Sequence, residues 1–81
     1  MNNSKKSHMK DREDVIRRIG TVTKVHGGMY EVEDKETGMK VLCTLNGKMK
    51  MHSIKLMLGD KVEIEMSLYD LTKGRVVYRH K

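Results

Sequence analysis

The side chains with the clearest chemistry in this sequence are cations that gather where acids are absent. Residues 38–59 and 71–81 contain no Asp or Glu, and all eleven acids fall in residues 11–14, 31–36 and 60–70. With a formal net charge of +6, this segregation predicts a positive field over part of the surface and a polyanion, such as a nucleic acid, as the partner. The candidate phosphate-binding side chains are Lys48, Lys50, His52, Lys55, Lys73, Arg75 and Arg79.

The residues that would support catalysis are few and are not spaced to converge. The four histidines, His8, His26, His52 and His80, are not paired with Cys or carboxylates at the spacing of a metal site. Cys43 falls on the expected inward face of a strand, where a free cysteine acts as a small core residue. No glycine-rich loop of the P-loop or dinucleotide-binding kind occurs. We therefore expect a binding protein with no enzymatic activity, metal or cofactor.

Length and composition predict one small domain. At 81 residues, the chain has room for a single modest core. Residues 1–13 are polar and lack apolar periodicity, so we expect a disordered tail there and the folded RNA-binding domain over residues 14–81. No apolar run approaches the roughly 18 residues of a membrane span, and the single cysteine rules out an intramolecular disulfide. We expect a cytoplasmic protein without a membrane partner.

Most of that domain follows the two-residue period of β-strands. Residues 61–66 alternate apolar and charged side chains, and residues 15–25 form a longer strand that should bend at Gly20. Glycine-containing turns at residues 26–28 and 36–38 separate the first three strands. In the last strand we expect Arg75, Val77 and Arg79 to face outward. The expected inward-facing residues of the strands other than the first and fourth are Tyr30, Val32, Met39, Val41, Cys43, Leu45, Val76 and Tyr78.

Residues 46–59 break the strand pattern and predict a short amphipathic helix, with Asn46 as its N-cap and Gly59 at its end. Helical spacing would place Lys48, His52 and Lys55 on one face. Another, apolar face would carry Met51, Ile54 and Leu58. Five strands with a helix between the third and fourth is the all-β arrangement of an OB-fold barrel. An SH3-like barrel is the main alternative, but it has no natural place for this insert.

The aromatic content bears on which nucleic acid would be bound. Proteins that bind single strands stack bases on aromatic side chains. This chain has only Tyr30, Tyr69 and Tyr78, and we expect two of them to face inward. We also expect Lys73 in a turn over residues 69–74, opened by Asp70. With little base stacking available, recognition would depend on phosphate contacts and on shape. These suit folded RNA better than a single strand.

Three stretches of the sequence carry a resemblance to a known family. They are Asn46-Gly47-Lys48-Met49-Lys50, Gly59-Asp60-Lys61-Val62 and the run from Tyr69 to Arg79, Tyr-Asp-Leu-Thr-Lys-Gly-Arg-Val-Val-Tyr-Arg. Together with residues near the start of the domain, they make the chain resemble bacterial translation initiation factor one. Where that family usually carries arginine, this chain has Lys50 and Lys55.

The resemblance implies an OB-fold protein, monomeric off the ribosome, without enzymatic activity. It implies binding to the decoding (A) site of the small ribosomal subunit, through ribosomal RNA and an adjacent ribosomal protein, together with initiation factors two and three. The alternative is a general RNA chaperone or single-strand binder of the cold-shock type, whose aromatic-rich strand pair is absent from this sequence.

Overall fold

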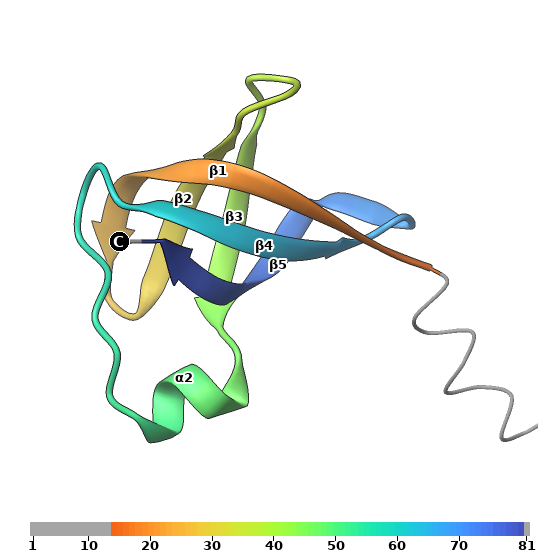
Figure 1. Ribbon diagram of the computed structural model, residues 1–81. Helices are drawn as coiled ribbons and strands as arrows, with labels where there is room; N and C mark the ends of the chain where they lie inside the picture. Colours follow the sequence, from red (N-terminus) through yellow and green to blue (C-terminus); the bar gives the residue numbers. More distant parts are fainter. Residues whose placement is uncertain (1–13, 81) are drawn as a thin grey trace, which may run out of the picture.

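The computed structural model describes residues 14–80 and shows five strands with one short helix (Figure 1). The expected disordered tail, residues 1–13, lies outside the described residues. The elements are β1 (Val15–His26), β2 (Met29–Asp34), β3 (Lys40–Leu45), α2 (Gly47–Met51), β4 (Lys61–Ser67) and β5 (Asp70–His80). Among the described residues, no helix is long and apolar enough to cross a bilayer.

The five strands close into a barrel in the order β1-β2-β3-β5-β4, with α2 between β3 and β4, which is the predicted OB-fold. The long strand β1 makes closure possible because it pairs with β4 through residues 15–21 and with β2 through residues 20–26. The change of partner occurs at Gly20, where an added Cβ would lie 2.5 Å from the Glu33 carbonyl oxygen. Only glycine allows this close approach.

The core is built from alternate residues of the strands, as the two-residue period predicted. In β4, Val62, Ile64 and Met66 are buried, while Glu63 and Glu65 lie on the outer face. The buried apolar residues are Val22, Tyr30, Val32, Val41, Cys43, Met49, Leu56, Val62, Ile64, Met66 and Val76, with Leu45 packed against them. Met39 was expected inside but precedes β3 and is exposed.

The predicted hairpin turns are present. Gly27 and Gly28 both have positive φ, and His26 pairs with Met29 across them, as in the two-residue turns that match the twist of paired strands. Between β2 and β3, the Gly38 N–H donates to the Asp34 carbonyl at 2.7 Å, and the Asp34 carboxylate accepts from the Glu36 N–H. Glycines with positive φ and short-range hydrogen bonds therefore determine the conformation of these two turns.

The expected alternation of β5 fails after Val76. The β4–β5 register places Ile64 opposite Val76 but Glu63 opposite Tyr78, so Val77 is an extra residue in β5. Such a β-bulge reverses the sides on which the following side chains point. Tyr78 therefore lies on the outer face beside Glu63 and is 55% exposed, and the prediction that it belongs to the core is wrong.

A second register shift corrects the position of Lys73. Ser67 pairs with Asp70 across a short turn, whereas Met66 pairs with Gly74, so the intervening residues of β5 bulge out of this ladder. Lys73 belongs to β5, where it pairs with Leu42 of the parallel strand β3, and does not lie in a turn. The turn chemistry predicted for Asp70 is present, since its carboxylate accepts from the Thr72 N–H at 3.0 Å.

The helix is shorter than predicted and turns a different face inward. The Asn46 side chain caps it by accepting from the Met49 N–H at 2.9 Å, as expected. However, α2 ends at Met51, and Ser53 has a positive φ, so helical spacing does not continue to Gly59. Met49 is the buried residue of α2. Of the expected apolar face, only Ile54 packs against the core, while Met51 (81%) and Leu58 (66%) are exposed.

Candidate nucleic-acid interface

The cations of α2 lie beside the last strand. Lys48 and Lys50 are exposed on the helix, and His52 forms its C-cap. The Asn46 N–H donates to the Val76 carbonyl at 3.0 Å, which joins the start of the helix to β5. Lys48 and His52 therefore face a groove of about 260 Å³ that β5 completes with Val77, Tyr78 and Arg79.

Arg79 lies in this groove and not on the outer face shared with Arg75. Because the bulge at Val77 reverses the alternation, Arg79 pairs with Val62. Its Nη1 donates to the carbonyl oxygen of Lys55 at 3.0 Å. This bond ties the segment after α2 to β5 and brings Lys55 close to the groove. Three of the predicted side chains, Lys48, His52 and Arg79, therefore line one groove, and Lys55 is joined to it through its backbone.

Lys73 and Arg75 form a second group further along β5. Both line a shallow cleft of about 370 Å³ between β5 and β4, together with Thr44 of β3 and Glu65 of β4. Arg75 is directly opposite Glu65 in the β4–β5 ladder, and its Nη2 lies 3.6 Å from Oε1 of that carboxylate. Of the seven predicted cations, Lys50 stands apart as an exposed residue on α2.

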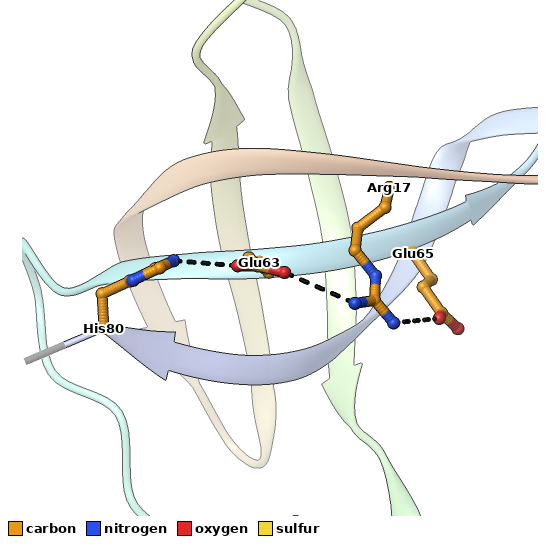
Figure 2. Close-up of polar contacts among 4 residues, drawn as sticks. All are labelled: Arg17, Glu63, Glu65 and His80. Atoms are coloured by element: carbon orange, nitrogen blue, oxygen red, sulfur yellow. Dashed lines mark hydrogen bonds and ion pairs between the residues drawn. The ribbon is translucent and has the colours of Figure 1, made fainter.

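An ionic network covers the outer face of β4 (Figure 2). Arg17 of β1 lies between Glu63 and Glu65, with Nη2 at 2.9 Å from the Glu65 carboxylate and Nη1 at 3.5 Å from that of Glu63. His80 approaches Glu63 from the other side at 3.1 Å. The hydrogen bond from Arg17 is the main cause that lowers the pKa of Glu65, and Arg75 contributes to the same effect. The network thus holds Glu65 as a carboxylate.

Cys43 and the potential metal ligands are the other groups of the described residues that bear on chemistry. Burial raises the pKa of the Cys43 thiol to about 12, which leaves almost no thiolate near neutral pH. Across residues 14–80, no three His, Cys, Asp or Glu side chains gather in a way that could hold a metal ion. The arrangement offers cations, hydroxyls and exposed tyrosines, which are the groups that contact nucleic acid.

Residues 4–81 match the family model of translation initiation factor 1A / IF-1. The chain belongs to this family. Translation initiation factor IF-1 of Chlamydia felis is 49% identical over 73 residues, which cover 90% of this chain and 100% of that protein. The Chlamydia pneumoniae protein of the same name is 48% identical, and the match again covers 90% of this chain and 100% of that protein. The chain is therefore a translation initiation factor, a protein of the biosynthetic machinery.

Solved structures agree with the barrel. The solution structure of the translation initiation factor IF-1 from the Wolbachia endosymbiont of Brugia malayi matches with a TM-score of 0.69 and 29% identity, over 85% of this chain and 82% of that one. YjeQ from Thermotoga maritima matches with a TM-score of 0.67 and 35% identity, over 82% of this chain but only 23% of YjeQ.

Sequence reasoning missed several residues of the initiation factor's surface. Arg17 and Glu65 are 48 residues apart, and only the β1–β4 pairing brings them together. The exposure of Tyr78 could not be read from the alternation, because the bulge interrupts it. Tyr69, in the turn before β5, is 81% exposed. Two tyrosines are thus available to stack, not the single one expected.

Proposed function

We propose that this initiation factor binds the small ribosomal subunit at its decoding (A) site, through ribosomal RNA and an adjacent ribosomal protein, and acts there with initiation factors two and three. It would do so in the cytoplasm, as a monomer off the ribosome and without enzymatic activity. The observation that carries the proposal is the arrangement of cations along β5 and α2. Two groups, one with Lys48, His52 and Arg79 and one with Lys73 and Arg75, lie on the same strand or beside it.

The physical basis of binding would be phosphate contact and shape. Phosphate contacts fix the orientation of a protein on RNA, and A-form helices are recognised mainly through their backbone. Lys50 and Lys55 act as point charges without the planar fork of arginine. Arg75 and Arg79 are the guanidinium groups of the interface, and Arg79 has one donor engaged by the Lys55 carbonyl.

Co-sedimentation tests the proposal. The protein should sediment with purified small subunits in preference to large subunits and free single-stranded RNA. Replacing Lys48 and Lys73 by Ala should lower the slope of log affinity against log salt by about 0.7–0.9 for each phosphate that the variant no longer neutralises. Replacing Lys24 and Lys35 by Ala is the matched control, because both are exposed and lie outside both groups. Equal binding to all three partners would refute the proposal.

The exposed tyrosines support one second candidate, a general single-strand binder or RNA chaperone. Tyr69 is 81% exposed and Tyr78 is 55% exposed, and a base stacked on an aromatic side chain contributes about 1–3 kcal/mol. If this function dominates, replacing both tyrosines by Ala should abolish binding to oligouridine. If ribosome binding dominates, the same change should leave binding to small subunits within a few-fold.

A further inference from the structure

The cleft between β4 and β5 brings two cations, two hydroxyls and one carboxylate together. Its lining residues are Val15, Thr44, Glu65, Met66, Ser67, Lys73, Gly74 and Arg75. Lys73 and Arg75 supply positive charge, and the hydroxyls of Thr44 and Ser67 can donate hydrogen bonds, as such groups do to phosphate oxygens. A cleft of this composition suits an anion, yet the carboxylate of Glu65 already occupies part of it.

Glu65 holds Arg75 only loosely. The distance from Arg75 Nη2 to Glu65 Oε1 is 3.6 Å, which is longer than an ordinary N–H···O hydrogen bond of about 2.7–3.2 Å. The Arg75 side chain is 58% exposed, so an incoming anion can reach it. The contact between them is therefore an ion pair that an external phosphate can replace.

Glu65 has a stronger partner on its other side. Arg17 Nη2 lies 2.9 Å from Glu65 Oε2, which is full hydrogen-bond distance. Figure 2 shows the two side chains joined by this contact. The three side chains form one row across the sheet, since Arg17 is opposite Glu65 in the β1–β4 ladder and Glu65 is opposite Arg75 in the β4–β5 ladder. When Arg75 leaves, Glu65 still has a counter-ion.

We infer that this cleft binds a backbone phosphate of RNA and that Glu65, held by Arg17, is its built-in competitor. The inference rests on the proposed function, because it assigns a subsite within the same interface. The phosphate takes the place of Glu65 at Arg75, and Arg17 keeps the displaced carboxylate neutralised. Glu65 therefore weakens RNA binding, and Arg17 strengthens it without touching the RNA.

A double-mutant cycle on the full chain tests this arrangement. The variants are Glu65→Gln, Arg17→Ala and the double variant, and the probes are purified small subunits and a short RNA duplex. Glu65→Gln should tighten binding about two- to five-fold, the range that a partly exposed ion pair supports, and Arg17→Ala should weaken it by a similar factor. In the Glu65→Gln background, Arg17→Ala should weaken binding no more than Lys35→Ala does, because the carboxylate that competes for Arg75 is gone.

Controls separate this exchange from a general change of charge and from loss of folding. Glu33→Gln makes the same charge change as Glu65→Gln on an exposed residue of β2, and Lys35→Ala matches the charge change of Arg17→Ala. Glu33→Gln should change the affinity for RNA less than Glu65→Gln does, and Lys35→Ala should change it less than Arg17→Ala does. Arg17→Lys keeps the charge but not the fork, so its affinity should lie between wild type and Arg17→Ala. Denaturation curves establish that each variant is folded.

Two results would overturn the inference. If Arg17→Ala weakens binding equally with and without Glu65, then Arg17 contacts the RNA itself. If Glu65→Gln has no more effect than Glu33→Gln, then Glu65 does not compete for Arg75. Either result, with normal binding of the wild type to small subunits, leaves the proposed function standing. A third result separates the two proposals. If the wild type shows no preference for small subunits, but the variants' affinities for the RNA duplex change as predicted, the proposed function fails and the phosphate site remains.

Discussion

At the scale of single residues, Ile64 and Tyr78 show how burial separates structural from surface roles in neighbouring strands. Ile64 is fully buried in β4, and Tyr78 is 55% exposed on the outer face of β5. Ile64→Ala should cost about 2–5 kcal/mol of unfolding free energy, because it leaves a cavity in the barrel. Tyr78→Ala should cost about 1 kcal/mol or less, as is usual for surface substitutions. Urea denaturation measures both, and equal losses would mean that Tyr78 packs inside.

The pKa of Glu65 predicts how stability depends on pH. The hydrogen bond from Arg17 is the largest cause that holds this pKa below its ordinary value of 4.5. Because the unfolded state takes up the proton first as the pH falls, the stabilisation is complete above pH 4.5 and disappears as the pH passes through the lower, folded-state pKa. Arg17→Ala should therefore lower the Tm at neutral pH, and the gap to wild type should close in acid.

The Glu65→Gln background provides the control for this pH dependence. Arg17 also contacts Glu63 at 3.5 Å, so a part of the gap can belong to that second carboxylate. Thermal melts of Arg17→Ala in the Glu65→Gln background should show a smaller gap at neutral pH. A gap of unchanged size would assign the effect to Glu63 and not to Glu65.

At the scale of elements, the sequence predicted correctly those features that depend on residues close together in the chain. The alternation of β4, the glycine turn at residues 27–28 and the Asn46 cap depend on neighbours in the chain, and all three were predicted correctly. The bulge at Val77 and the register shift before Gly74 depend on how β5 must bend to pair with both β3 and β4. No local signal encodes that requirement, so the sides of Tyr78 and Arg79 and the position of Lys73 were predicted wrongly.

The cap of α2 gives a prediction for a single element. The helix has only five residues, so the bond from the Met49 N–H to the Asn46 side chain is a large part of its terminal hydrogen bonding. Asn46→Ala should lower the unfolding free energy by about 1 kcal/mol, and Asn46→Ser should restore most of it, since serine also caps. Chemical denaturation checks the values. An equal loss with Ser and Ala would show that another property of Asn46 matters.

At the scale of the whole molecule, closure of the barrel and segregation of charge act together. Each strand pairs with two others, and the parallel pairing of β3 with β5 is the step that completes the ring. The same pairing places Arg75 opposite Thr44 and Lys73 opposite Leu42. It thereby sets the positions of the cations from residues 71–81 relative to α2, which directly follows β3. The fold thus places the two acid-free stretches of the sequence next to each other, through the pairing of β3 with β5.

Closure also predicts that the first ten residues are dispensable for folding. The strand pairings described for residues 15–80 already close the barrel. Deleting residues 1–10 should therefore change the Tm by less than about 4 °C, the shift that corresponds to roughly 1 kcal/mol in a domain of this size. Gly74→Ala is the positive control, because its Cβ would lie 2.8 Å from the Glu65 carbonyl oxygen and force β4 and β5 apart. A deletion that lowers the Tm as much as Gly74→Ala would show that the first ten residues stabilise the barrel.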